Sequence, residues 1–160
     1  MTGGGSSLPE MQRLLAVLAA GKSCAEVGTA FGEGAAAMAS TAKSLVTVEL
    51  DPERASVALG RLRDFPNVEL LVGDWRDHLP QRAPFDLLFF DGGHFDQSPD
   101  SINLVAVGGL IVKDDLSPHW EGPDPVREVL FNHPELVAVE LLTTPQTAAV
   151  LAVRLEATAG

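Results

Sequence analysis

Residues 26–34 have the sequence Glu26-Val27-Gly28-Thr29-Ala30-Phe31-Gly32-Glu33-Gly34, and they follow an apolar run of strand length. Glycines at such a point allow a tight turn and a close approach of backbone to a ligand. The spacing is glycine-x3-glycine-x-glycine, which differs from the G-x-G-x-x-G arrangement that places a pyrophosphate on a helix N-terminus. We therefore expect a strand, a ligand-binding turn and a helix, and the spacing disfavours a dinucleotide ligand.

Apolar runs of strand length alternate with helical segments on both sides of this turn. We predict strands at residues 23–27, 45–50, 68–72, 85–90 and 110–112. Strands that are separated by crossover segments form a parallel, doubly wound sheet.

Two further strand-like runs close the chain, at residues 135–142 and 148–155. Residues 143–147 join them, and this connection is too short for a crossover helix, so the two runs should pair antiparallel. The expected fold class is α/β: a Rossmann-like, doubly wound, mostly parallel seven-stranded sheet with a C-terminal antiparallel hairpin.

Several helix starts are marked by local sequence. Asp51-Pro52 and Asp124-Pro125 each place a side-chain acceptor at the cap and proline in the first turn. Ser7-Leu8-Pro9-Glu10 has the serine-x-x-glutamate form of a capping box and predicts a short amphipathic helix over residues 7–20.

Length and composition limit the possible functions. A chain of 160 residues with 46% hydrophobic residues fits one folded domain, which we expect over residues 1–160. Its 22 acidic and 11 basic residues give a net charge of -11, which repels a phosphate backbone, so we expect no nucleic-acid partner. With Cys24 as the one cysteine, no basic leader and no apolar run of membrane-spanning length, the sequence favours a cytoplasmic protein without a membrane partner.

An acidic residue, Glu49, stands at the end of the strand that follows the glycine turn. At this position a carboxylate can accept hydrogen bonds from ribose hydroxyls. A ribose-bearing ligand without a pyrophosphate is therefore expected. Asp51 is better explained as a helix cap than as a second ribose ligand, because Pro52 follows it.

Four segments in order carry a resemblance to a known family. They are Glu26-Val27-Gly28-Thr29 with Gly32, Val46-Thr47-Val48-Glu49, Val72-Gly73-Asp74, and Phe85-Asp86-Leu87-Leu88-Phe89-Phe90-Asp91. Over about residues 24–116 the chain resembles class I S-adenosylmethionine-dependent methyltransferases, particularly small O-methyltransferases similar to catechol O-methyltransferase. The closing antiparallel hairpin also agrees with that fold.

The resemblance implies a role for each matched residue. The methionine part of the cofactor would be surrounded by Glu26, Gly28, Thr29 and Gly32, with Asp91 near its amine. Glu49 would hold the ribose, and Gly73, Asp74 and Trp75 would meet the adenine. This assigns a cofactor-binding half to residues 23–80 and an acceptor-side half to residues 85–155. S-adenosylmethionine carries a sulfonium and an ammonium against one carboxylate, so an acidic pocket would attract it.

The reacting end of the site is expected after the fourth and fifth strands, at Asp91-Gly92-Gly93-His94 and Lys113-Asp114-Asp115. In one alternative, Asp91, Asp114 and Asp115 bind magnesium or calcium, which would lower the pKa of a bound hydroxyl. In the metal-dependent O-methyltransferases that this region resembles, the ligands are two aspartates and an asparagine, so Asp115 stands at the asparagine position. In the other alternative, Asp91 orients the cofactor amine and His94 is the general base, since histidine ordinarily titrates near neutral pH.

The methyl acceptor is expected to be the hydroxyl of a small molecule. The fourth strand ends in Asp91-Gly92-Gly93 and lacks the Asn/Asp-Pro-Pro-aromatic signature of amino-group methyltransferases. His119 and Trp120 lie in a loop rich in proline and glycine that can border the acceptor. Only about 20 residues precede the first strand, so the pocket is either open or completed by a second copy in a homo-oligomer. A dinucleotide-dependent oxidoreductase and a catalytically silent S-adenosylmethionine-binding module are the alternatives.

Overall fold

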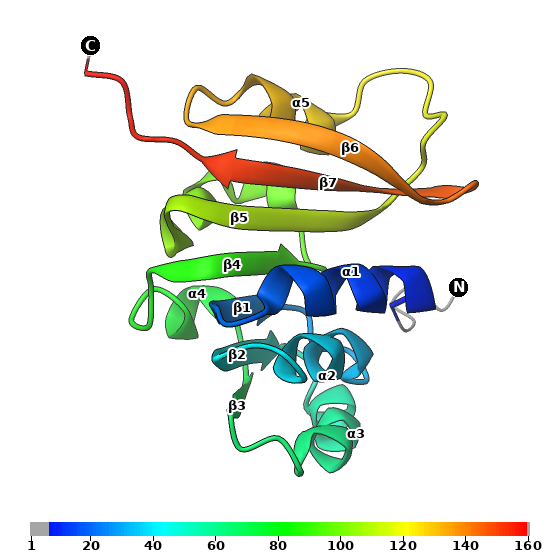
Figure 1. The fold of residues 1–160 in the computed structure, drawn as a ribbon, viewed down its shortest axis with the longest axis vertical. Coiled ribbons are helices and arrows are strands. Elements are labelled where there is room, and N and C mark those ends of the chain that lie inside the picture. Colours follow the sequence, from blue (N-terminus) through cyan, green and yellow to red (C-terminus); the bar gives the residue numbers. More distant parts are fainter. Residues whose placement is uncertain (1–6, 160) are drawn as a thin grey trace.

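The fold is a seven-stranded sheet between two layers of helices (Figure 1). A computed structural model describes residues 7–159. The strand order is β3-β2-β1-β4-β5-β7-β6. The strands are β1 (Ser23–Val27), β2 (Ser44–Glu49), β3 (Val68–Val72), β4 (Phe85–Phe90), β5 (Val105–Leu116), β6 (Leu136–Thr144) and β7 (Thr147–Arg154).

The first five strands are parallel, and β7 runs antiparallel to both β5 and β6. The expected fold class is therefore confirmed. Of the expected domain, residues 1–6 and 160 lie outside the described residues.

Strand β5 is longer than the apolar pattern indicated. We expected residues 110–112, whereas the strand spans Val105–Leu116. Its ends have partners on different neighbours: Val105 pairs with Phe85 of β4, and Leu116 pairs with Ala148 of β7. Lys113 pairs with Val150, so Asp114 and Asp115 lie at an irregularity between two residues that pair with β7. An apolar pattern does not reveal this pairing.

The closing hairpin has a two-residue turn, Pro145–Gln146, which is tighter than the expected connection of residues 143–147. The strands extend into that connection because Thr144 pairs with Thr147, and their hydroxyls are 2.7 Å apart.

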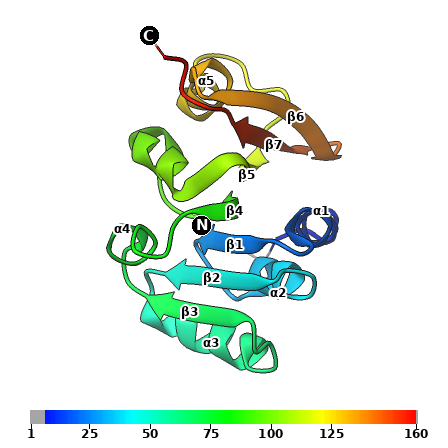
Figure 2. The same ribbon diagram turned by 60° about the vertical axis from the view of Figure 1, so that its left-hand side comes forward.

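The helices form one layer on each face of the sheet. One face carries α1 (Pro9–Ala19), α2 (Glu33–Ala39) and α3 (Pro52–Leu62); the other carries α4 (Trp75–His78), the 3-10 helices η1 (Phe95–Gln97) and η2 (Pro99–Leu104), and α5 (Pro125–Asn132). Figure 2 shows α1 and α2 on the opposite side of the sheet from α4. Successive strand residues point to opposite faces, so Phe89 packs in the α1–α3 layer and Phe90 in the other.

Two of the three expected helix caps are confirmed. The carboxylate of Asp51 accepts the backbone N–H of Glu53 at 2.8 Å, and that of Asp124 accepts the N–H of Val126 at 3.0 Å. The capping box at the first helix is wrong. This helix begins at Pro9 and ends at Ala19, and its N-cap position, Leu8, makes no side-chain cap hydrogen bond. Proline fixes the first helical residue here, because its φ suits that position and it has no N–H to be capped.

Within residues 7–159, no helix combines the length and the apolar character that crossing a bilayer requires.

Candidate active site

A pocket of about 450 Å³ lies at the carboxyl ends of the parallel strands. Its backbone and apolar lining comes from Val27, Gly28, Ala30, Val48, Leu50, Gly73, Trp75, Gly92 and Gly93, and its polar lining from Glu49, Arg54, Asp74, Arg76, Asp91, His94, Gln97 and Asp115. The strand order places residues that follow β3 and residues that follow β5 at opposite ends of this pocket. Open α/β sheets bind ligands at this edge.

The turns after β1 and β4 meet backbone to backbone. Gly28 has φ +90°, and a Cβ at this position would lie 2.6 Å from the backbone N of Gly92. Any side chain at residue 28 would therefore push the two loops apart. The backbone N–H groups of Asp91 and Gly92 both donate to the carbonyl of Val27, at 2.9 and 2.7 Å. This contact fixes the position of Asp91 beside the glycine turn.

Glu49 is held at the centre of the pocket by backbone groups. One carboxylate oxygen accepts the N–H of Ala30 at 2.7 Å, and the other accepts the N–H of Asp51 at 3.0 Å. Ala30 reaches this oxygen from a left-handed conformation, φ +49°. The side chain of Glu49 is fixed while further lone pairs of both oxygens remain available, as hydrogen bonds from a ribose diol require.

Three of the expected cofactor ligands, Glu26, Thr29 and Gly32, lie behind the pocket wall rather than on it. The Thr29 and Thr47 hydroxyls are 2.6 Å apart, and Thr47 donates to the carboxylate of Glu26 at 2.5 Å. Gly32 is the N-cap of α2 and packs against Ala58. These residues can shape the glycine turn, but they do not form its surface.

Burial raises the pKa of Glu26 from 4.5 to about 8, because the side chain is 1% exposed. The hydrogen bond from Thr47 opposes this rise, and the nearby Asp114 and Glu49 add to it. The energetic cost of a charge at this position is therefore considerable.

The opposite end of the pocket from β5 is formed by the turn after β3. The carboxylate of Asp74 caps α4 by accepting the N–H of Arg76 at 2.9 Å, and the Arg76 guanidinium is 3.4 Å from the same carboxylate. That guanidinium also lies over the Trp75 ring, 4.7 Å from its centroid. The Trp75 ring meets Phe90 edge to face. One face of Trp75 is therefore already covered.

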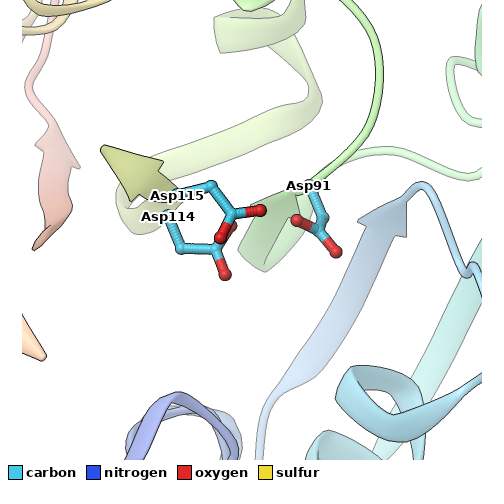
Figure 3. Close-up of side chains that lie close together, drawn as sticks. All are labelled: Asp91, Asp114 and Asp115. Atoms are coloured by element: carbon cyan, nitrogen blue, oxygen red, sulfur yellow. The ribbon is translucent and has the colours of Figure 1, made fainter. Parts of the chain in front are cut away.

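Three carboxylates gather at the ends of β4 and β5. One carboxylate oxygen from each of Asp91, Asp114 and Asp115 lies within 4.8 Å of the other two. Figure 3 shows the three side chains close together. Asp114 is 5% exposed, and its Oδ1 has no hydrogen-bond partner. Burial, followed by repulsion from Asp91, raises the pKa of Asp114, and burial also raises that of Asp91. Asp115 reaches the group from a left-handed conformation, φ +58°.

This cluster fits a hard divalent cation. The donors are carboxylate oxygens, which magnesium and calcium prefer, and one of them is buried without a partner. Asp91 and Asp115 line the pocket, and Asp114 lies behind them. His94 also lines the pocket and is exposed.

Several lining residues were not expected from the sequence. Arg54 and Arg76 were missed because surface arginines have no distinctive spacing, although each lies within three residues of a cap at a strand end. Thr47 is a polar residue in an otherwise apolar strand run, and that irregularity was the available signal.

A family model described as a methyltransferase domain matches residues 25–116, which is more than half of the 160-residue chain. Protein-L-isoaspartate O-methyltransferase of Burkholderia vietnamiensis (strain G4 / LMG 22486) is 36% identical over 90 residues. That alignment covers 54% of this chain and 29% of the relative, so the match spans less than a third of the relative's length.

Solved structures share the fold. Cofactor-bound Rv0187 from MTB has a TM-score of 0.76 and 24% identity, with 95% of this chain and 83% of that chain covered. The O-methyltransferase from Bacillus cereus in complex with SAH has a TM-score of 0.74 and 19% identity, with 95% and 84% covered. With its glycine turn, its strand order and the matched domain, this chain belongs to the class I S-adenosylmethionine-dependent methyltransferases.

Proposed function

We propose that this chain transfers the methyl group of S-adenosylmethionine to a hydroxyl group of a small molecule. One observation carries the proposal: Glu49, which is fixed by backbone hydrogen bonds, lines the same pocket as His94 and two acids at the ends of β4 and β5. The first feature suits an adenosyl ligand, and the second suits the deprotonation of an acceptor.

The cofactor would lie along the carboxyl edge of the sheet. Its adenine would occupy the β3 end, between Asp74 and Trp75, with its ribose hydroxyls on Glu49. Its methionine part would reach the backbone contact between Gly28 and Gly92, where Asp91 is placed to accept from the ammonium. The sulfonium methyl would then face the end of the pocket near β5.

The reaction would be an in-line displacement. The acceptor oxygen attacks the methyl carbon, the carbon–sulfur bond breaks, and its electron pair stays on sulfur, which leaves neutral S-adenosylhomocysteine. The hydroxyl proton goes to the imidazole of His94, which is exposed at this end of the pocket. Positioning and removal of water supply most of the rate in such a transfer.

The carboxylates of Asp91, Asp114 and Asp115 would hold a magnesium or calcium ion. When bound, such an ion would lower the pKa of the acceptor hydroxyl. Without it, Asp91 retains its role toward the cofactor amine and His94 its role as base.

The acids also favour a hydroxyl over a carboxylate acceptor. Asp91 and Asp115 line the pocket at the acceptor end, and neither is paired with an arginine or lysine among the described ion pairs. When no cation is bound to them, these acids repel a second anion. The isoaspartate-directed relative shares sequence with this chain over 90 residues, which are 29% of the relative's length.

The test is methyl transfer from labelled S-adenosylmethionine to a panel of phenols and ring diols, with and without magnesium. Wild-type protein should form S-adenosylhomocysteine, and His94→Gln should slow turnover by roughly a hundredfold without weakening cofactor binding. His133→Gln is the matched control, because this histidine is outside the pocket and accepts the N–H of Glu135. Tight binding of S-adenosylhomocysteine with no transfer to any hydroxyl would instead identify a silent binding module.

A further inference from the structure

A second hollow lies next to the acceptor end of the cofactor pocket. The loop of residues 117–121 and the hairpin turn Pro145–Gln146 line this hollow, whose volume is about 810 Å³. Its lining begins at Ser117, two residues after Asp115, which lines the cofactor pocket. Because two residues span at most about 7 Å, both hollows have lining residues close together at the carboxyl end of β5.

One arginine holds both ends of the loop that follows β5. Arg127 of α5 donates to the carbonyl of Ser117 at 2.8 Å and forms an ion pair with Asp124 at the other end of the loop. The same guanidinium binds Glu140 of β6 at 2.7 Å, and its side chain is 19% exposed. The loop is therefore anchored at both ends to α5 and to the hairpin.

The middle of this loop presents a large aromatic ring to solvent. Trp120 is 60% exposed. Its indole N–H donates to the carbonyl of Pro123 at 3.1 Å, so the polar edge of the ring is satisfied within the loop. What remains free is an apolar face that stacks on rings and attracts cations. The other tryptophan, Trp75, has a face covered by Arg76.

The charged residues that line the two hollows near the carboxyl end of β5 are acidic. Glu121 lines the second hollow, and no lysine or arginine does. Asp91 and Asp115 line the cofactor pocket there, whereas its arginines, Arg54 and Arg76, follow β2 and β3. An acidic lining beside an exposed indole attracts a cation and repels an anion.

We propose, on the basis of the proposed function, that the acceptor spans both hollows. Its hydroxyl lies at Asp91 and His94, and its ring and side chain lie against Trp120 and Glu121. The site therefore selects hydroxylated ring compounds with a cationic or neutral side chain over those with a carboxylate.

The test compares two ring diols that differ in the charge of their side chain, dopamine and dihydrocaffeate. We expect kcat/KM for dopamine to be about tenfold higher or more. Trp120→Ala should lower kcat/KM for dopamine about tenfold, mainly through KM, while Phe131→Ala, an exposed aromatic on α5, changes nothing. Glu121→Lys should lower the ratio of kcat/KM for dopamine to kcat/KM for dihydrocaffeate at least threefold. Glu128→Lys, at an exposed position on α5, should leave this ratio unchanged.

Binding gives a second readout. The chain has two tryptophans, so Trp75→Phe leaves Trp120 as the one reporter. With S-adenosylhomocysteine present, dopamine should quench the fluorescence of Trp120 at a lower concentration than dihydrocaffeate does. Equal methylation of both diols, with no effect of Trp120→Ala, would overturn this acceptor site and leave methyl transfer standing. Methylation of neither diol, with S-adenosylhomocysteine still bound, would overturn the proposed function and this inference together.

Discussion

Buried acids are the residues whose chemistry most clearly departs from that of an ordinary globular domain. Burial raises the pKa of Glu26, Asp91 and Asp114, and nearby carboxylates add to the rise in each. No arginine or lysine forms an ion pair with any of the three among residues 7–159. Such groups reduce the stability of the folded state once they ionise, and they persist where a ligand benefits from them. Two predictions follow from particular members of this group.

Glu26→Gln should stabilise the protein increasingly as pH rises. The pKa of Glu26 is raised from 4.5 to about 8 by burial, so below pH 4.5 the carboxyl is neutral in both states. Between pH 4.5 and 8 the unfolded state ionises first, and wild-type stability falls through that window. The variant should therefore gain roughly 3 to 5 kcal/mol in free energy of unfolding by pH 8. Urea denaturation at pH 4.5, 6 and 8 measures the free energy of unfolding of the variant and the wild type. Glu53→Gln, at an exposed position, is the control. If the difference between Glu26→Gln and the wild type did not change with pH, the account would be contradicted.

Asp114→Asn should stabilise the metal-free protein by about 1 to 2 kcal/mol at neutral pH, because it removes a buried acid whose pKa is raised and whose Oδ1 has no hydrogen-bond partner. It should also abolish the rise in melting temperature that magnesium gives the wild type. Asp115→Asn, at an exposed position, should change the metal-free stability less. If millimolar magnesium leaves the wild-type melting temperature unchanged, the three carboxylates do not form a cation site.

At the scale of elements, the contact between the turns after β1 and β4 holds the site together. Gly28→Ala should destabilise the protein by about 2 to 4 kcal/mol and weaken S-adenosylhomocysteine binding, because its Cβ would overlap the backbone of Gly92. Gly60→Ala in α3 is the matched control: nothing lies within 4 Å of its Cβ, and alanine should stabilise the helix by about 0.5 to 1 kcal/mol. Calorimetry measures the melting temperature of both variants. If Gly28→Ala melted at the same temperature as Gly60→Ala, the close contact between Gly28 and Gly92 would be contradicted.

The elements also show how far sequence reasoning reaches. The bounds of β1, β3 and β4 follow from apolar runs between turn residues, and the caps at Asp51 and Asp124 follow from the proline after each. The polar end of β5 could not be predicted, because its strand conformation depends on pairing with β7, far along the chain.

The same limit applies to the candidate site. Residues that end a strand, such as Glu49 and Asp91, were found because parallel strands bring their carboxyl ends together. The position of Glu26 and Thr29 behind the pocket wall could not be predicted, because it depends on hydrogen bonds through Thr47 on the neighbouring strand. Arg127 illustrates a third case, because its partners Ser117, Asp124 and Glu140 meet only in the folded chain.

At the scale of the whole molecule, the net charge of -11 acts on every ligand. S-adenosylmethionine has a net positive charge and S-adenosylhomocysteine has none, so the affinity for the first should fall more steeply with salt. Titrations at low and high sodium chloride concentration measure the two slopes, and equal slopes would contradict a role for the acidic surface. Two expectations stay predictions: that nucleic acids are not partners, and that the pocket is either open or completed by a second copy.

Calorimetric titration with S-adenosylhomocysteine tests the central claim, which is that Glu49 holds the ribose of an adenosyl cofactor in this pocket. Wild-type protein and Glu53→Ala should bind equally well, because Glu53 is exposed and does not line the pocket. Glu49→Ala should bind at least tenfold more weakly while its circular dichroism remains that of a folded chain. Undiminished affinity in folded Glu49→Ala, or binding of NAD in place of S-adenosylhomocysteine by the wild type, would contradict the account.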